Sequence, residues 1–307
     1  MSEVSTKGRG WQGAVLKLLG ADDVTLTVTS TEAVTDHYLR LGFTGGGLFT
    51  KRTVHPTMWV RLWFESDGKL HQRGYTLVDP DPAADTFSIE FAIHDGPAAR
   101  WAQQARPGDV INATAMGSKF EMPESAQAFL IAGDTASMAA INSLLDAISA
   151  SSNPLTPTTI WFEYQHDSDK DLPLRLRPQD TVHWIPRERD GAALVDAVKA
   201  AAFDATGQYG WVALDSASTR AVSAMVSPRP SCISAPVSMM DSPPSWRMPT
   251  SNDTLVRVDG RSKIIASVLP SSGFLPFSCA FSFAFMAAPA DSMLRSSPSG
   301  SSLMSRK

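Results

Sequence analysis

The residues whose types could carry chemistry concentrate between positions 71 and 109. Arg73 offers a planar, permanently charged guanidinium that can hold a diphosphate through two hydrogen bonds. Tyr75 offers a flat ring and a hydroxyl, and Thr76 adds a second hydroxyl beside it. Gly96 precedes a predicted short helix whose first N–H groups can face a phosphate. Each of these groups could therefore hold one part of a flavin dinucleotide.

The order of these residues resembles a known family. The segment Arg73-Gly74-Tyr75-Thr76 matches the RxY[ST] flavin motif of the ferredoxin-reductase superfamily. The segment GPAARWAQQARPGD at 96–109 resembles the GPASxWA…PGD segment of siderophore-interacting proteins, the FAD-dependent ferric-siderophore reductases. The resemblance extends from about residue 24 to about residue 221. It implies that FAD contacts a group of residues in the first domain: Arg73, Tyr75, Thr76, Ile93, His94, Gly96, Ala98, Ala99 and Trp101.

Taken singly, these residues also have ordinary structural explanations. An Arg-Gly-Tyr-Thr tetrapeptide often begins a strand by chance, and a histidine at a strand end, such as His94, is commonly a satisfied polar residue. Trp101 shares one predicted helical face with neighbouring alanines, as a core residue would. Ala99 stands where the family usually has serine, which removes one side-chain hydrogen bond to phosphate worth about 1–2 kcal/mol. The ordered combination of residues favours the cofactor site.

Periodicity predicts a β-barrel domain followed by an α/β domain. Six strands and one short helix are expected before residue 120, which is typical of a small antiparallel barrel: strands at 24–30, 38–43, 57–64, 72–78, 86–93 and 109–115, and a helix at 98–105. Strands then alternate with helices, which is typical of a parallel sheet: strands at 129–132, 158–164, 181–185 and 209–214, and helices at 136–149 and 191–203. We assign 1–23 to a flexible N-terminal arm, 24–122 to the FAD-binding β-barrel domain and 123–222 to an NAD(P)H-binding α/β domain.

Two strand ends of the α/β domain could receive a nicotinamide cofactor. A small residue lets the cofactor approach the backbone, and the N–H groups of a following helix favour its phosphates. The family carries a Gly-Asp-Glu-Thr-Ala-like sequence at the first strand end and a Trp-Val-Ala-Gly-Glu-like sequence at the second. In this chain Leu214 replaces the second glycine and could crowd the cofactor, and the less favoured alternative is that both stretches are ordinary strand-to-helix turns. The resemblance implies five contacts to NAD(P)H: Gly133, Asp134, Thr135, Ala136 and Asp215.

The charge distribution bears on partners. The chain has a net charge of −4, and residues 1–222 alone carry a net charge of −8. An acidic body argues against nucleic acid as a partner. Ferric siderophores are often anionic, so the basic residues Lys51, Arg52 and Lys119 are candidates for substrate contact near the open side of the barrel, although surface lysines are usually only solvated. No metal site is expected in the protein itself.

The last segment, 223–307, differs in composition. About a quarter of it is serine, with frequent proline and methionine. We expect it to be a disordered tail that replaces the family's last helix and strand, either natural or the product of a frameshift or fusion. The strand at 209–214 should then form an exposed sheet edge.

The compartment is predicted from cysteines and apolar runs. Cys232 and Cys279 both lie in the last segment, so the body has no disulfide or iron–sulfur ligands. No signal peptide is recognised, and the most apolar run, Phe274–Ala290, is interrupted by Pro276 and several serines. We expect a cytoplasmic monomer without stable membrane association.

The resemblance implies FAD-dependent reduction of a ferric siderophore by NAD(P)H, with iron released as Fe(II) in the cytoplasm. A general flavin- or ferredoxin-linked reductase is an alternative, because fold does not decide substrate. A second alternative is a non-catalytic protein that binds FAD or a siderophore, because the family's C-terminal element is not recognised in this chain.

Overall fold

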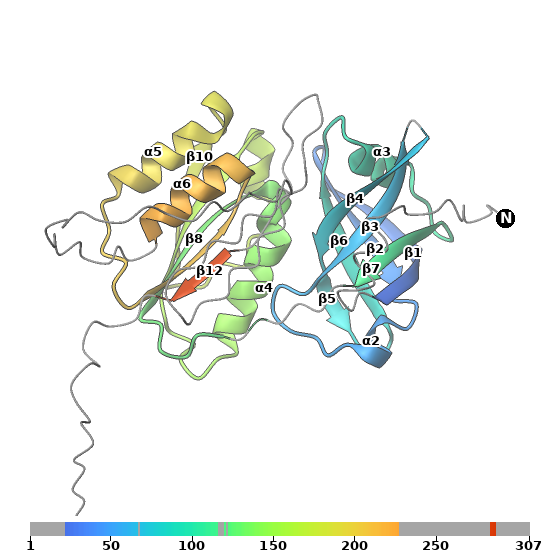
Figure 1. Ribbon diagram of the computed structural model, residues 1–307, viewed down its shortest axis with the longest axis horizontal. Helices are drawn as coiled ribbons and strands as arrows, with labels where there is room; N and C mark the ends of the chain where they lie inside the picture. The colour runs from blue at the N-terminus through green and yellow to red at the C-terminus, as the bar shows by residue number, and fades with distance from the viewer. Residues whose placement is uncertain (1–21, 67, 116–119, 121, 227–282, 287–307) are drawn as a thin grey trace, which may run out of the picture.

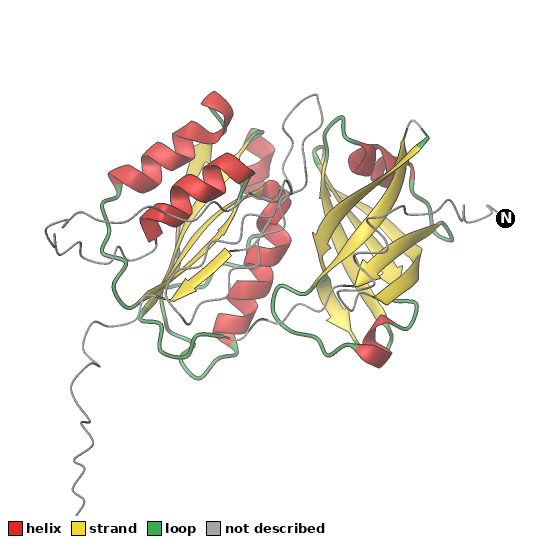
Figure 2. Cartoon of the chain, in the orientation of Figure 1, coloured by secondary structure: helices red, strands yellow, loops and turns green. Residues whose placement is uncertain are grey.

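The structure, a computed structural model, describes residues 22–66, 68–115, 120, 122–226 and 283–286. They form two domains that lie side by side, one built mainly of strands and one in which helices cover both faces of a sheet (Figures 1 and 2). Three elements of the sequence prediction fall outside this part of the chain: the arm at 1–21, Lys119, and the tail at 227–282 and 287–307.

Within the described residues, the first domain is a curled antiparallel sheet of seven strands rather than six. Their order is β4-β3-β7-β1-β2-β6-β5, so β4 and β5 are the two edges. The strand that sequence reasoning missed is β5, which is four residues long and contains Pro80, a combination that gives little alternation to detect. The elements are β1 Asp22–Thr35, β2 Tyr38–Thr44, α2 Leu48–Lys51, β3 Trp59–Ser66, β4 Lys69–Thr76, β5 Val78–Asp81, β6 Thr86–Ala92, α3 Pro97–Gln104 and β7 Val110–Ala115.

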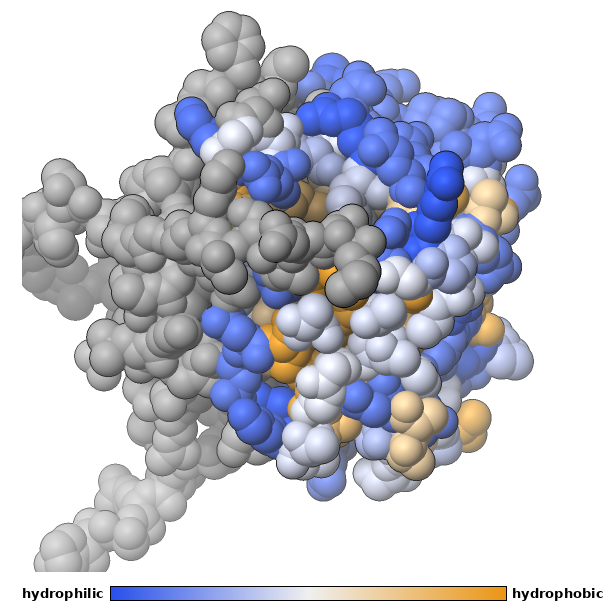
Figure 3. Space-filling view, turned by 90° about the vertical axis from the view of Figure 1, so that its right-hand side faces the viewer, coloured by the Kyte–Doolittle hydropathy of each residue, from blue (hydrophilic) through white to orange (hydrophobic). Residues whose placement is uncertain are grey.

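Alternation along these strands sends one set of side chains into a continuous apolar core. Leu26 and Val28 of β1 and Leu41 and Phe43 of β2 are at most 1% exposed, as expected for residues two apart on one face. On the side of the molecule drawn in Figure 3, the coloured surface is largely hydrophilic, and apolar residues show in a few places. The helices α2 and α3 lie at opposite ends of the curled sheet (Figure 1).

The second domain contains a sheet ordered β10-β9-β8-β11-β12 in the part of the chain that the structure describes. The first four strands are parallel, and β12 pairs antiparallel with β11. Helix α4 covers the face toward the first domain, and α5 and α6 cover the other face (Figure 1). The elements are β8 Ala128–Asp134, η1 Thr135–Ser137, α4 Met138–Ser149, β9 Thr158–Tyr164, η2 Asp167–Asp171, β10 Thr181–Pro186, η3 Arg189–Gly191, α5 Ala192–Ala200, β11 Gln208–Ala213, α6 Ser216–Val226 and β12 Phe283–Met286.

Two expectations about the end of the chain are wrong. Helix α6 runs from Ser216 to Val226, so a helix does follow β11 and continues past residue 222. Its Val222 and Val226 are at most 3% exposed, because their spacing of four residues places them on one buried helical face. Strand β11 is also not an exposed edge, because β12 pairs with it at 209–212.

The domains share a packed interface. Tyr38 of the first domain is 1% exposed and belongs to the apolar core of the second. Its hydroxyl donates to a carboxylate oxygen of Glu90 at 3.1 Å, and the backbone N–H of Thr57 donates to Ser143 Oγ of α4 at 2.9 Å. The first domain is therefore held against α4 by both apolar and polar contacts.

Candidate functional site

The predicted phosphate helix is present as α3, and its local sequence explains where it begins. Gly96 is the N-cap in extended conformation, and proline occupies the first helical position, where its missing N–H costs nothing. An α-helix leaves the N–H groups of its first residues without intrahelical acceptors, here those of Ala98 and Ala99. Both alanine side chains are at most 4% exposed and are buried. Their contribution to a cofactor is therefore limited to the backbone.

The corner before this helix depends on glycine and histidine together. A Cβ at Gly96 would lie 2.2 Å from Cε1 of His94, so only glycine fits against the ring. The Gly96 N–H donates to His94 Nδ1 at 2.9 Å, which requires an unprotonated Nδ1. Burial, and next the nearby Arg73 guanidinium, lower the pKa of His94. His94 therefore shapes the corner as a neutral acceptor.

Arg73 and Tyr75 lie on one face of β4, whereas Thr76 is one residue further and alternates to the other face. The ring of Tyr75 packs 4.6 Å from the ring of Phe91, centroid to centroid, and Trp101 packs 5.7 Å from Phe64. Tyr75 and Trp101 are half-buried members of the rim of the first core. Trp101 thus has the core role that its helical spacing indicates, and Ile93 also packs against this core.

Sequence reasoning missed Arg100. Its guanidinium turns back toward the start of α3, where Nη1 donates to the backbone oxygen of Asp95 and Nη2 lies 3.4 Å from Ser66 Oγ. The positive charges of Arg73 and Arg100 both lower the pKa of His94, and the Arg73 guanidinium donates to the Gln72 backbone oxygen at 2.7 Å. The signal was available, since helical side chains lean toward the N-terminus and an arginine in the first turn can reach that end.

Two guanidinium groups and a helix N-terminus fit the diphosphate of a dinucleotide. We call the group formed by Arg73, His94, Gly96 and Arg100 the flavin corner. The residues present therefore suit the cofactor, and the exposed Asp95 is the acidic side chain next to them.

The predicted substrate cations lie elsewhere. Lys51 and Arg52 both approach Asp22, at 3.9 and 2.8 Å. Asp22 is aligned with Ala115, which pairs with the start of β3, whereas Arg100 reaches Ser66 at the end of that strand. Six residues of strand separate these positions, a distance of about 20 Å. The structure does not bring Lys51 and Arg52 to Arg100, and Arg73 lies closer to their row, because its partner Leu62 is two residues along β3 from the partner of Ala115.

At the end of β8, Gly133 and Asp134 of the predicted nicotinamide site stabilise the turn between the strand and helix α4. A Cβ at Gly133 would lie 2.4 Å from Ser137 Oγ and 2.7 Å from Ile141 Cδ1, so α4 can approach the strand only over a glycine. Asp134 forms a capping box: its Oδ1 accepts from the Ser137 N–H at 3.0 Å, and its own N–H donates to Ser137 Oγ at 2.8 Å. Thr135 and Ala136 lie in the same turn, half-buried and exposed respectively.

The end of β11 is arranged in a similar way. Asp215 Oδ1 accepts from the N–H groups of Ala217 and Ser218, at 2.9 and 3.1 Å, and so caps α6. Leu214 is 1% exposed in the apolar core beneath α5 and α6. The expectation that Leu214 crowds a cofactor is therefore wrong, because alternation turns its side chain into that core.

Sequence reasoning also missed Glu163 of β9, which is aligned with Asp134 across the sheet. It is 3% exposed and pairs with Arg187. Burial raises the pKa of Glu163, Arg187 opposes this, and Asp134 and Asp215 raise it further. We call Asp134, Glu163 and Asp215 the carboxylate edge. Among the described residues, no cluster of three or more acidic, histidine or cysteine side chains is placed to hold a metal ion.

Comparison with known proteins agrees with this architecture. Residues 23–118 match the siderophore-interacting FAD-binding domain, and residues 126–239 match the siderophore-interacting protein model. The chain belongs to the siderophore-interacting protein family. Among curated relatives, the mycobactin import ATP-binding/permease protein IrtA of Mycolicibacterium smegmatis is 35% identical over 219 residues, which is 69% of this chain and 25% of the relative. The chain thus spans about a quarter of the length of the curated relatives it matches.

Solved structures show the same fold at low sequence identity. The siderophore-interacting protein from Acinetobacter baumannii is 19% identical with a TM-score of 0.57, and the alignment covers 66% of this chain and 82% of that one. The ferredoxin reductase in carbazole 1,9a-dioxygenase is 14% identical with a TM-score of 0.52. That alignment covers 67% of this chain and 65% of the reductase. Among the described residues, none of the helices is both long and apolar enough to cross a bilayer.

Proposed function

We propose that this chain is a cytoplasmic, FAD-dependent reductase that uses NAD(P)H to reduce ferric siderophores. The overall reaction oxidises one NAD(P)H to NAD(P)⁺ and H⁺ while two Fe(III) chelates become two Fe(II) chelates. Oxygen ligands hold Fe(II) less tightly than Fe(III), so reduction favours release of the metal. Bound FAD would supply the redox chemistry, because it exchanges both a hydride and single electrons.

The observation that carries the proposal is the flavin corner. Arg73 and Arg100 would bind the diphosphate by charge-assisted hydrogen bonds, together with the first N–H groups of α3. Gly96 and His94 hold the corner open at the place where the chain must turn. Tyr75 would orient the aromatic part of the cofactor from the rim of the core.

The role of the second domain is to present the nicotinamide. Its carboxyl sheet edge is where ligands of open parallel sheets bind. In this chain, that edge offers exposed Ala136 and half-buried Thr135 beside the capping box. The protein's own part in the reaction is to bind, orient and shield the reactants, and no side chain is assigned a proton transfer.

The proposed oxidant is a ferric siderophore. The curated relatives are named for mycobactin import, and we propose a ferric siderophore as the oxidant for this chain. Lys51, Arg52 and Lys119 remain its predicted contacts. The ion pairs of Lys51 and Arg52 with Asp22 would have to open or shift for an anionic chelate to bind there.

One experiment tests the proposal in two steps. The purified full chain should show flavin absorption at about 450 nm, or acquire it on addition of FAD. Under anaerobic conditions NADH or NADPH should bleach that absorption, and a ferric siderophore should restore it while an Fe(II)-specific chelator changes colour. Bleaching without reoxidation by any ferric siderophore would favour the general flavin reductase instead.

A second candidate, binding without turnover, has one observation in its favour. The carboxylate edge is acidic, and both of its aspartates already cap helices. Stable FAD binding without bleaching by either nicotinamide cofactor would support this candidate and would overturn the reductase.

A further inference from the structure

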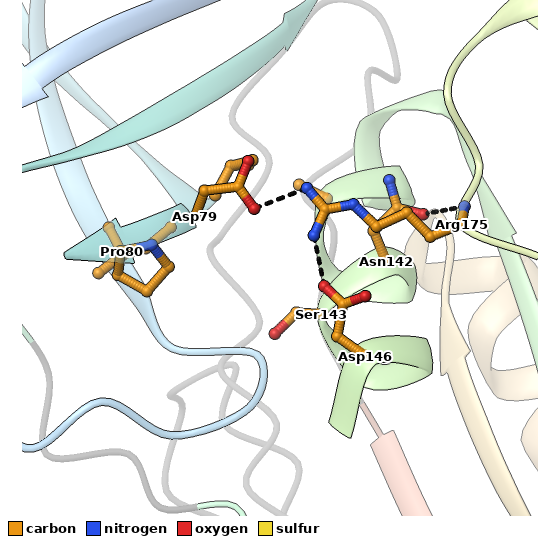
Figure 4. A pocket seen from close by; sticks show the side chains of 9 residues that line it. Asp79, Pro80, Asn142, Ser143, Asp146 and Arg175 are labelled. Carbon is orange, nitrogen blue, oxygen red and sulfur yellow. Dashed lines mark hydrogen bonds and ion pairs between the residues drawn. The ribbon is translucent and has the colours of Figure 1, made fainter. Parts of the chain in front are cut away.

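The interface between the domains carries a charged network that the proposed function does not use. Arg175 lies in the segment after η2, on the second domain. Its Nη2 lies 2.6 Å from Asp79 Oδ1 of β5, and its Nη1 pairs with Asp146 of α4. One guanidinium thus bridges an acid of the first domain and an acid of the second, as Figure 4 shows.

The position of Arg175 is fixed by a buried amide. Asn142 of α4 is 5% exposed. Its Nδ2 donates to the Pro173 backbone oxygen at 3.0 Å, and its Oδ1 accepts from the Arg175 N–H at 2.8 Å. The segment that carries Arg175 is therefore tied to α4 at two points, so the backbone of Arg175 is held in a fixed position relative to α4.

The acceptor on the first domain is equally constrained. Asp79 adopts a left-handed backbone conformation with φ of 47°, which is uncommon outside glycine. Its other carboxylate oxygen pairs with Arg40 of β2. Partial burial alone would raise the pKa of Asp79, but hydrogen bonds from Arg175 and Arg40 outweigh it and lower that pKa. The carboxylate is thus held charged between one guanidinium from each domain.

A small cavity lies beside this network, between β5 and α4. Its walls come from both domains, so the two surfaces are not tightly packed at this point (Figure 4). The charged bridge therefore spans a part of the interface where apolar packing contributes less. The lining residues are Leu77, Val78, Asp79, Pro80, Ala139, Asn142, Ser143, Asp146 and Arg175.

We propose that Arg175 is a positioning residue that latches the two domains in one relative orientation. This positioning role rests on the proposed function, because the orientation of the domains then sets how closely a nicotinamide on the second domain approaches a flavin on the first. The side chains of Arg175, Asp79 and Asp146 are between 36% and 51% exposed. Exposed pairs contribute little to overall stability, so the latch controls geometry rather than folding.

Hydrogen–deuterium exchange on the full chain tests the latch without any reaction. The reporter is the peptide that contains Thr57, whose N–H bonds to Ser143 across the interface, and the reference is a peptide from β8. In Arg175→Ala the Thr57 peptide should exchange about fivefold faster while the β8 peptide is unchanged. Arg175→Lys should fall between, because one ammonium does not provide the planar fork that pairs with two carboxylates.

The matched control is Arg189→Ala. Arg189 pairs with Asp196 at 2.7 Å, is 63% exposed, and has both partners within the second domain. It should leave the Thr57 peptide at the wild-type rate. If Arg175→Ala also leaves that peptide at the wild-type rate, the latch is overturned.

Stopped-flow reduction of bound FAD by NAD(P)H tests the positioning role. Arg175→Ala should lower the limiting rate about tenfold with little change in nucleotide affinity, because orientation and not binding is lost. Faster exchange with an unchanged limiting rate would overturn the positioning role. Absence of any flavin reduction in the wild type would overturn the proposed function, and the exchange measurement would still decide the latch.

Discussion

The flavin corner and the carboxylate edge are both ends of strands that lead into helices, yet they are built in opposite ways. The flavin corner has two guanidinium groups and a helix N-terminus capped by glycine. The carboxylate edge has three acids, two of which already cap helices through their own oxygens. Similar backbone plans therefore give one corner suited to an anion and one that opposes it.

The difference indicates how the two cofactors would be held. A diphosphate at the flavin corner meets positive charge and backbone donors, so tight binding is expected there. A nicotinamide dinucleotide at the carboxylate edge meets negative charge, so its phosphates must stay away from these acids. Tight FAD and weak, exchangeable NAD(P)H is the arrangement that a reductase needs.

The largest expected effect concerns Leu214 at the end of β11, and it tests whether this side chain lies in the apolar core or faces an open cofactor site. Leu214→Gly should cost about 4 kcal/mol of unfolding free energy, because it removes a buried leucine and leaves a cavity. The matched control is Leu155→Gly, the same change at a residue that is 76% exposed, which should cost about 1 kcal/mol or less. Urea denaturation measures both, and equal losses would show that Leu214 faces an open space.

The second prediction concerns Arg73, the arginine of the flavin corner whose loss should weaken FAD binding more. Arg73→Ala should weaken FAD binding about ten- to a hundredfold, the value of a charge-assisted bond to phosphate. Lys51→Ala is the control, since Lys51 lies at the other end of the curled sheet and is 71% exposed. Fluorescence titration of apo-protein with FAD gives both affinities. Equal affinity in the wild type and Arg73→Ala would remove Arg73 from the site.

A smaller effect is expected for Arg100. Arg100→Ala should weaken FAD binding about fivefold, since this exposed guanidinium is partly screened by solvent. It should leave riboflavin binding unchanged, because riboflavin has no phosphate. Arg106→Ala, an exposed arginine just after α3, should change neither affinity. A similar loss for both ligands would mean that Arg100 supports the fold of the corner instead of contacting phosphate.

The smallest effect concerns the charge of the carboxylate edge. Burial raises the pKa of Glu163 in the folded protein, so the folded state holds this proton more tightly than the unfolded state. The resulting stability is present below the unfolded pKa and is lost as the pH rises through the folded pKa. Glu163→Gln does not titrate, so its unfolding free energy relative to the wild type should improve as the pH rises from about 4 to about 7, by about 1 kcal/mol or less.

This comparison needs denaturation curves of the two proteins at both pH values. A difference that stays constant with pH would mean that the ion pair with Arg187 fully offsets the burial of Glu163.

Much of the fold was predictable because it follows local patterns. Alternation located six strands of the first sheet, and the glycine-proline start located α3. The seventh strand, β5, is short and carries proline, and α6 was hidden because composition changes within it. The sequence thus predicted an element correctly where the spacing of apolar residues and the capping residues pointed to the same boundaries.

The site was predictable only in part, for a physical reason. Arg73 and Gly96 stand in a motif, whereas Arg100 matters through the direction of its side chain and Glu163 through its burial. Arg175 meets Asp79 across 96 positions of sequence, and pairs this distant are set by the packing of two domains. The spacing of residues along the chain does not predict such contacts.

Tyr38 has a consequence for how this architecture can be inherited. It begins a strand of the first domain, yet it belongs to the core of the second, and Val34 and Ala92 of the first domain also pack against that core. A cut between the domains would leave three apolar side chains in water on one piece and a gap in the core of the other. The matched region is about a quarter of the length of the first curated relative, so a longer protein that carries this fold must keep both domains together for Tyr38 to stay covered.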